Sequence, residues 1–363
     1  MAAAGVSVGY DRLKEVEEFD SSKIGVKGLS DSGITTIPKI FVHPPETLPE
    51  IRSSSTSASI PLIDLANVKS DLHRPKIVEQ ISDAARNWGF FQLINHGVPV
   101  SVLDETIAAY KAFFEQPAEV KAKHYAREEN HGVMYASNND LYRSKVATWH
   151  DTLQVWRGPV PAKLEDIPEV CRKEVLEWEM QAKMVAETVM ELLCEGLGLE
   201  AGKLKELGYT ETRAIVGHIY PYCPQPDLTV GLGSHTDYGM LTVLLQNQVP
   251  GLQVKHGNEW VDVKPLHGSL TINVGDTLQI VSNGEYKSVQ HRVTANSSKE
   301  PRVSIIEFFN ADNRDKVRRH GPLPELISPE KPAIYRDFTF PEFIQNFFSK
   351  PFGNKALVET FLL

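Results

Sequence analysis

Three residues in the second half of the chain have the types and spacing of metal ligands. His235 and Asp237 are two positions apart, and His291 follows within the same region. In an extended strand, residues two apart project from one face, so His235 and Asp237 can point to one centre while Thr236 points away. With His291 they supply two imidazoles and one carboxylate, a donor set that leaves coordination positions of non-haem Fe(II) open. Open positions predict a reactive iron centre.

A second pair of side chains follows eleven residues after His291. Arg302 and Ser304 are also two positions apart, so a guanidinium and a hydroxyl emerge on one face of a strand. A guanidinium fork with one further donor suits a carboxylate. We therefore expect a dicarboxylic co-substrate whose distal carboxylate binds Arg302 and Ser304 while its 2-oxo acid end chelates the iron.

Short apolar and β-branched runs surround these side chains and must position them. Residues 242–245, 270–273 and 278–281 are predicted as strands, and Asn283-Gly284 is the strongest local signal for a hairpin. The region that holds the candidate site is therefore predicted to be antiparallel β.

Less specific interpretations of the same residues exist. A lone His-x-Asp or Arg-x-Ser is a weak signal and usually marks polar residues on an exposed strand. A structural zinc site needs four protein ligands and is commonly rich in cysteine, whereas Cys171, Cys194 and Cys223 have no ligand spacing. The order of the motifs and the phrases between them favour the iron site.

Several phrases of the sequence resemble those of plant 2-oxoglutarate and Fe(II)-dependent dioxygenases. They are Tyr220-Pro-Tyr-Cys-Pro-Gln-Pro-Asp-Leu-Thr, Gly233-Ser-His-Thr-Asp, Pro250-Gly-Leu-Gln-Val, Asn273-Val-Gly-Asp, Ser282-Asn-Gly-Glu-Tyr-Lys-Ser-Val-Gln-His-Arg and Pro301-Arg-Val-Ser, and Trp149-His-Asp also resembles a family phrase. Near the start, Tyr10-Asp-Arg, Gly25-Val-Lys-Gly-Leu and Ile37-Pro-Lys-Ile-Phe resemble the aminocyclopropanecarboxylate oxidase homologue subgroup, which includes hydroxylases of alkaloids and benzoxazinoids. The resemblance extends nearly end to end.

The resemblance implies a fold and an activity. The fold would be mainly β with α flanks: a double-stranded β-helix, or jelly roll, with a helical N-terminal region and a C-terminal helix. The enzyme would use Fe(II), 2-oxoglutarate and O2, with ascorbate as reductant, to hydroxylate a small plant metabolite such as an alkaloid, a benzoxazinoid or a phenolic. Succinate and carbon dioxide would be the other products.

The resemblance also implies roles for further residues. Tyr220 would place its hydroxyl on the co-substrate carboxylate, and His218, where many relatives carry Asn, would substitute as a donor. Phe308 matches a position whose ring faces the substrate, although a strand phenylalanine is also a common core residue. Tyr238 and Asn310 are further candidates for the same wall.

The chain divides into four segments that we expect to form one compact body. Residues 1–59 form an N-terminal extension, 60–205 an α/β region, 211–313 the jelly-roll core, and 314–363 a C-terminal helix and tail.

Helical periodicity predicts helices at 10–19, from Pro75 to Trp88, at 100–115, at 174–195 and at 340–348. Met180, Met184 and Trp178 are expected in the core. Glycines at 25, 28 and 33 are expected to interrupt the helical pattern of the extension. Residues 131–156 are expected as a surface loop or one wall of the substrate pocket, with His150 on the surface.

Composition and charge exclude other classes of protein. The net charge is −9 and no block of lysines or arginines is present, which argues against a nucleic-acid partner. Three cysteines form no disulfide framework, and the chain starts without the charged and long apolar segments of a secretory signal. We expect a cytosolic monomer with no membrane partner.

Two other functions stay open at this stage. An ethylene-forming oxidase would use the same iron site with ascorbate and would not consume oxoglutarate, although the N-terminal phrases resemble the homologue subgroup instead. A barrel that only binds a ligand is the third hypothesis, and the complete set of His, Asp, His, Arg and Ser argues against it.

Overall fold

The computed structural model describes residues 10–48, 58–127, 132–311, 316–349 and 356–363. A large sheet dominates the molecule. Its eight strands, in spatial order, are β1 (Leu62–Asp64), β2 (Phe90–Ile94), β10 (Leu270–Val274), β7 (Leu241–Gln246), β12 (Arg302–Asn310), β5 (Thr212–Tyr220), β4 (Asp151–Trp156) and β3 (Val133–Ser137). Only β1 and β2 pair in parallel, so the sheet is mixed but mostly antiparallel.

A second sheet faces the first. Its four strands are β6 (Val230–His235), β11 (His291–Thr294), β8 (Leu252–His256) and β9 (Glu259–Asp262). One buried apolar cluster joins side chains from both sheets: Phe90, Tyr220, Leu244 and Ile306 from the large sheet, and Leu252, Val254 and Val293 from the small one. This cluster lies between the two sheets.

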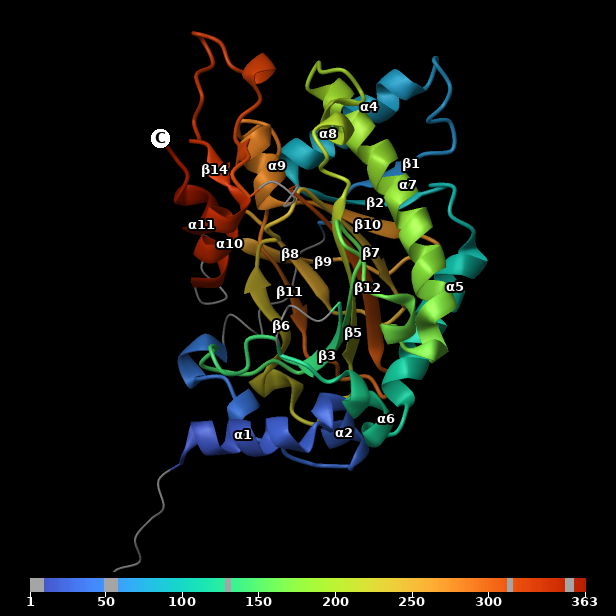
Figure 1. Cartoon of the computed structure of the whole chain (residues 1–363), viewed down its shortest axis with the longest axis vertical. Coiled ribbons are helices and arrows are strands. Elements are labelled where there is room, and N and C mark those ends of the chain that lie inside the picture. The colour runs from blue at the N-terminus through green and yellow to red at the C-terminus, as the bar shows by residue number, and fades with distance from the viewer. Residues whose placement is uncertain (1–9, 49–57, 128–131, 312–315, 350–355) are drawn as a thin grey trace, which may run out of the picture.

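Three helices cover the opposite face of the large sheet (Figure 1). They are α4 (Arg74–Asn87), α5 (Val100–Glu115) and α7 (Arg172–Gly196), which confirms the three predicted helices. Pro75 lies in the first turn of α4, where its missing N–H removes no helical hydrogen bond. The strand residues that pack under these helices, Val303, Ile305 and Phe309, alternate with those of the inner cluster, as strand geometry requires.

The predicted core stripe of α7 is wrong at two positions. Trp178 is fully buried, with Ala182, Val185 and Val189 on the same face, whereas Met180 and Met184 are exposed. Successive helical residues are about 100° apart, so a residue two positions from a buried one points nearly to the other side.

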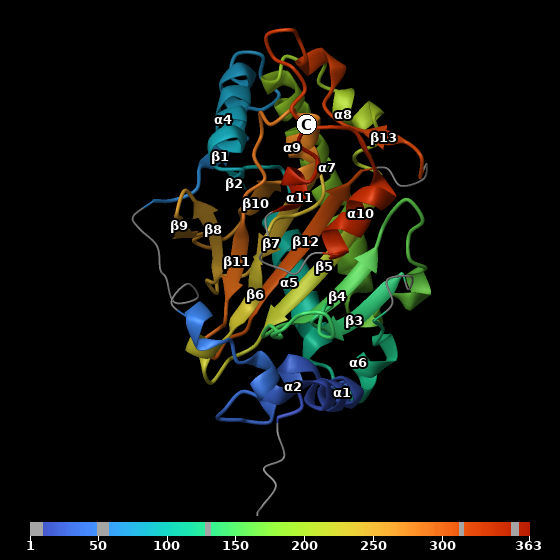
Figure 2. The same ribbon diagram turned by 90° about the vertical axis from the view of Figure 1, so that its left-hand side faces the viewer.

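The N-terminal extension lies across one end of the sheets (Figures 1 and 2). It contains α1 (Arg12–Ser22), which confirms the predicted short helix, and α2 (Gly25–Asp31). The expectation that Gly28 interrupts helix is wrong, because Gly28 lies inside α2. Val26 and Phe41 from the extension pack with Trp149 in a separate apolar cluster. The serine-rich residues 53–57 fall outside the described residues.

Residues 278–281 do not form the predicted strand. They belong to the helix α9 (Asp276–Val281), because a four-residue apolar run suits a helical turn as well as a strand. Asn283 and Gly284 do adopt positive φ values of 52° and 79°, as a tight turn needs. However, the Gly284 N–H donates to the carbonyl of Gln279 at 2.8 Å, so the pair ends a helix instead of joining two strands.

The expectation of a loop over 131–156 is also wrong in large part. Within its described part, β3 and β4 pair with each other, and β4 pairs with β5 at the edge of the large sheet. The polar residues of this segment do not mark a loop, because Ser137, Asp151 and Thr152 are buried and hydrogen-bonded inside the fold. His150 is likewise buried, not on the surface.

The C-terminal segment packs beside α9 and contains the predicted aromatic helix. Its elements are β13 (Arg319–His320), β14 (Phe338–Thr339), α10 (Phe340–Ser349) and α11 (Ala356–Glu359). The remaining short elements are α6 (Ala118–Lys121), α8 (Lys203–Glu206), and 3-10 turns at η1 (Lys39–Phe41), η2 (Pro45–Thr47), η3 (Ala122–His124), η4 (Leu164–Asp166), η5 (Glu169–Cys171), η6 (Pro226–Leu228) and η7 (Pro324–Leu326). Among the described helices, none combines the length and apolarity needed to cross a membrane.

Candidate metal centre and carboxylate site

The structure brings His235, Asp237 and His291 together. His235 is the last residue of β6 and pairs directly with His291, the first residue of β11. Asp237 lies two residues beyond the end of β6, and its Oδ1 is 3.6 Å from the Nε2 atoms of both imidazoles. The side chain of Thr236 turns away and donates to Asp276 at 3.0 Å. The three donor atoms therefore converge as the spacing predicted.

Backbone carbonyls set the orientation of both imidazoles. Nδ1 of His235 lies 2.8 Å from the carbonyl oxygen of Gly233, and Nδ1 of His291 lies 3.4 Å from that of Val289. Because a carbonyl only accepts, each Nδ1 is the donor in these contacts, and each Nε2 is the nitrogen that faces Asp237. A histidine that binds a metal through Nε2 needs this arrangement, with Nδ1 as the donor.

Two residues that sequence reasoning missed hold the Asp237 carboxylate. Its Oδ2 accepts hydrogen bonds from Thr242 Oγ1 at 2.6 Å and from Asn273 Nδ2 at 2.7 Å. Thr242 on β7 and Asn273 on β10 are directly opposite each other in the sheet. Both bonds use Oδ2, so Oδ1 remains available on the side of the imidazoles.

The charge states of the cluster fit a divalent metal. Burial and the neighbouring His235 lower the pKa of His291 to about 4, so this imidazole is neutral at pH 7. Burial opposes ionisation of Asp237, but the two histidines and the two hydrogen bonds outweigh it and lower the pKa of the carboxyl. Two donors bound about 2.1 Å from one metal lie at most about 4.2 Å apart, which the 3.6 Å separations satisfy. Two imidazoles and one carboxylate match the donor set of non-haem Fe(II).

Arg302 is a buried cation, and the described residues offer it no anionic partner. Its side chain is 1% exposed at the start of β12, and burial lowers the pKa of the guanidinium. It donates to Gln246 Oε1 at 2.7 Å and, at 3.4 Å, to Ser304 Oγ, while its Nε has no hydrogen-bond partner. No carboxylate among the described residues contacts it.

A second buried arginine shows the contrast. Arg213 lies on β5 and contacts the carboxylates of Glu179 at 2.9 Å and Glu307 at 3.1 Å. Burying a charge is costly unless it is paired, and Arg213 follows that rule within the chain. Arg302 has no such carboxylate among the described residues, so its guanidinium is suited to an external one.

The other predicted carboxylate-binding residues surround Arg302. Strand pairing places Tyr220 opposite Arg302, with the guanidinium 4.9 Å from the phenol ring centre, and His218 opposite Ser304. On the other side of β12, Ser304 pairs with Gln246, whose Nε2 is buried without a partner. Sequence analysis missed Gln246, because only the pairing of β7 with β12 brings it to Arg302.

His218 is neutral and points its Nδ1 toward Thr152 Oγ1 at 2.9 Å. Burial, helped by the nearby His150 and Arg302, lowers the pKa of His218 well below its ordinary value. An uncharged imidazole therefore lies beside Ser304 and Arg302.

The three predicted substrate-wall residues are placed differently from one another. Phe308 is partly buried and packs against the inner cluster between the sheets. Tyr238 is also partly buried, and its ring centre lies 5.0 Å from that of Phe347 on α10. Asn310 is fully buried, and neither polar atom of its amide has a hydrogen-bond partner among the residues that the structure describes. Phe308 and Tyr238 thus retain some exposed surface, whereas Asn310 has none.

Two family models match the chain. The model of the 2OG-Fe(II) oxygenase superfamily matches residues 210–311, and the model described as non-haem dioxygenase in morphine synthesis N-terminal matches residues 60–171. The 1-aminocyclopropane-1-carboxylate oxidase homolog 5 of Arabidopsis thaliana is 44% identical over 352 residues, which cover 96% of this chain and 88% of the relative. The chain belongs to the 2OG-Fe(II) oxygenase superfamily.

A further relative and two solved structures are similar to this chain. A homolog from Solanum lycopersicum is 42% identical, with 93% of each chain covered. The crystal structure of JOX2 in complex with 2OG, Fe and JA superposes with a TM-score of 0.82 at 29% identity, covering 93% of this chain and 97% of that one. The dioxygenase for auxin oxidation in rice gives 0.70 at 25% identity, covering 84% and 100%. The enzyme is a dioxygenase that uses Fe(II) and 2-oxoglutarate, with ascorbate as reductant.

Proposed function

We propose that this oxygenase hydroxylates a small, planar plant metabolite, and that His235, Asp237 and His291 hold its iron. The observation that carries the proposal is the buried guanidinium of Arg302, which has no carboxylate partner in the described part of the chain. Fe(II) bound at the three ligands would supply the oxidation of a C–H bond, with succinate and carbon dioxide released from oxoglutarate. The protein supplies orientation and a dry environment.

The residues around Arg302 would orient oxoglutarate. Arg302 and Ser304 would donate to its distal carboxylate, and the Tyr220 hydroxyl would donate from the neighbouring strand. If Thr152 donates to Nδ1 of His218, the opposite Nε2 carries the proton and can donate to a co-substrate oxygen. Such contacts hold one end of the co-substrate and set its direction. A co-substrate of the right length then reaches the iron with its 2-oxo acid end.

The substrate would lie on the other side of the iron, against Phe308 and Tyr238. Phe308 follows Ser304 by four residues on β12, an even offset, so its ring is on the same inner face of the sheet. Aromatic rings favour planar, apolar partners. JOX2 with JA and the auxin dioxygenase support a small organic substrate, and we propose an alkaloid, benzoxazinoid, phenolic or similar polycyclic compound.

The same proposal includes the finer description of the fold. We infer that β10, β7, β12 and β5 of the large sheet, together with the small sheet, are the walls of a double-stranded β-helix over residues 211–313. Residues 1–59 and 60–205 would precede it as extension and α/β region, and 314–363 would follow as helix and tail.

A succinate-release assay over a panel of plant metabolites tests the function. With Fe(II), oxoglutarate and ascorbate, we expect succinate release to rise when a planar aromatic metabolite is added, and a hydroxylated product to form in equal amount. Ethylene formation from aminocyclopropanecarboxylate without oxoglutarate consumption would contradict the proposal and favour the ethylene-forming oxidase.

Phe308→Leu separates a pocket role from a core role. We expect product formation to fall far more than thermal stability, with oxoglutarate turnover continuing without product, because the ring orients the substrate and not the co-substrate. Product, succinate and melting temperature are measured on one preparation.

Phe309→Leu is the matched control, since Phe309 is fully buried on the opposite, helix-covered face. It should lose about 1–3 kcal/mol of unfolding free energy, as core substitutions commonly do, while each succinate still corresponds to one product. A large stability loss in Phe308→Leu with product and succinate still equal would show that Phe308 only fills the core.

A further inference from the structure

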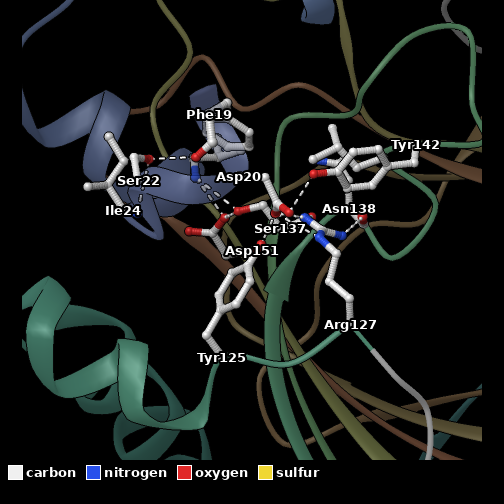
Figure 3. Close-up of polar contacts among 12 residues, drawn as sticks. Phe19, Asp20, Ser22, Ile24, Tyr125, Arg127, Ser137, Asn138, Tyr142 and Asp151 are labelled. Carbon is white, nitrogen blue, oxygen red and sulfur yellow. Dashed lines mark hydrogen bonds and ion pairs between the residues drawn. The ribbon is translucent and has the colours of Figure 1, made fainter. Parts of the chain in front are cut away.

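Two sequence phrases without an assigned role meet in the structure. Asp151, which ends Trp149-His-Asp, accepts hydrogen bonds from two backbone N–H groups of the phrase Gly25-Val-Lys-Gly. Its Oδ1 lies 2.7 Å from the N of Val26, and its Oδ2 lies 2.9 Å from the N of Lys27. The hydroxyl of Ser137 donates to the same carboxylate, as Figure 3 shows. The N-terminal extension is therefore bound to the first residue of β4.

Glycine at position 25 is what allows this contact. Gly25 has a φ of +71°, and a Cβ built there would lie 2.5 Å from Oδ2 of Asp151 and 2.6 Å from the Tyr135 hydroxyl. Real Cβ atoms do not approach other atoms so closely, and L residues rarely adopt this φ. Any side chain at Gly25 must displace Asp151 or the start of α2.

The residues on either side of Asp151 face the proposed oxoglutarate site. The buried His150 donates from Nδ1 to the carbonyl of Gly231 at 2.7 Å. Its ring centre is 5.1 Å from that of His218 and 5.6 Å from that of Tyr220.

Thr152 follows Asp151 and holds the other side of His218. It pairs with His218 across the sheet, and its hydroxyl makes the 2.9 Å hydrogen bond to Nδ1. Because successive strand side chains alternate, Asp151 reaches the extension while Thr152 reaches the site.

We propose that Gly25 and Asp151 form a latch through which the N-terminal extension positions His150 and Thr152, and with them His218 and Tyr220, for oxoglutarate. The inference rests on the proposed placement of oxoglutarate at Arg302. Asp151 is a positioning residue, since it contacts the extension and not the co-substrate. The extension thereby becomes a functional part of the co-substrate site.

Gly25→Ala tests the latch, with Gly33→Ala as its matched control. Gly33 has nearly the same φ, +74°, but nothing lies within 4 Å of a Cβ built there, so both variants strain the backbone and only one displaces Asp151. Calorimetry measures oxoglutarate binding to the full chain loaded with Mn(II). We expect the Kd of Gly25→Ala to rise by about tenfold or more, the scale for removing a residue that orients a binding group. Gly33→Ala should match the wild type, and Mn(II) affinity should be equal in all three.

Steady-state kinetics give a second readout. For Gly25→Ala the apparent KM for oxoglutarate should rise while kcat at saturating oxoglutarate is largely retained, whereas a general loss of folded protein would lower kcat alone.

A second pair of variants covers the case in which Gly25→Ala does not fold. Asp151→Asn keeps the side-chain size but replaces one acceptor with a donor that faces a backbone N–H. Its control is Asp20→Asn, because Asp20 anchors α1 of the same extension through Tyr142 at 2.8 Å and Arg127 at 2.7 Å, as drawn in Figure 3. Weaker oxoglutarate binding in Asp151→Asn alone supports the latch.

The outcomes distinguish failure of the latch from failure of the proposed co-substrate site. Wild-type oxoglutarate affinity in a folded Gly25→Ala or Asp151→Asn would overturn the latch. Equal weakening in Asp20→Asn or Gly33→Ala would also overturn it, because the effect would then be one of general stability. Absence of oxoglutarate binding in the wild type would instead contradict the proposed co-substrate site itself.

Discussion

Asp237→Ala is expected to abolish turnover and to weaken metal binding by more than about a hundredfold, while the chain stays folded. The carboxylate supplies the one anionic donor of the cluster, and changes to groups that merely orient a ligand already cost about 10–100-fold. Mn(II) affinity by calorimetry, succinate release with Fe(II), and the melting temperature together check this result.

Thr242→Val is a milder change at the same site, because it leaves all three proposed metal ligands in place. It removes the hydroxyl that donates to Oδ2 of Asp237 at 2.6 Å and leaves the shape of the side chain nearly unchanged. We expect metal affinity to fall by about 10–100-fold with turnover still measurable at high Fe(II). If Asp237→Ala keeps near-wild-type turnover, the metal is held by other residues and the assignment is wrong.

Arg302→Lys is expected to weaken oxoglutarate binding although the charge is kept. An ammonium cannot reproduce a two-pronged contact, and a hydrogen bond to a charged group contributes about 1.5–3 kcal/mol, so losing one raises Kd roughly 10- to 150-fold. The shorter reach of lysine also leaves Gln246 Oε1 without its 2.7 Å partner. Oxoglutarate titration at saturating Mn(II), together with the apparent KM at saturating Fe(II), measures the effect.

Arg213→Lys controls for the loss of a buried guanidinium. Arg213 is paired with Glu179 and Glu307 on the helix-covered side of the sheet, so its replacement should lower the melting temperature and leave oxoglutarate affinity unchanged. Equal oxoglutarate affinity in the wild type and Arg302→Lys would mean that the co-substrate carboxylate binds elsewhere.

Local geometry explains what could be predicted for the site. Two residues separated by one position share a strand face whatever surrounds them, so Arg302, Ser304 and Phe308 were expected on one face and lie there. The helices at 74–87, 100–115 and 172–196 were predictable for a similar reason. The helical period of their apolar residues can be seen within each continuous segment of the sequence.

Local signals failed where a segment suits two structures. Asn283-Gly284 suits the left-handed backbone of a hairpin turn and that of a helix end equally well. In this chain the residues before the pair form the helix α9. The polar composition of 132–156 suggested a loop, but Ser137, Asp151 and Thr152 find hydrogen-bond partners inside the fold and lie on buried strands.

The sequence by itself determined which side chains are candidates for the chemistry: two imidazoles and a carboxylate, and a guanidinium with a hydroxyl, each pair spaced so that strand alternation points its members in one direction. The tertiary structure decided what holds them. Thr242 and Asn273 reach Asp237, Gln246 reaches Arg302, and Asp151 reaches the extension only through pairings between segments far apart in the chain. Such pairings depend on how the whole chain packs, and no local pattern encodes them.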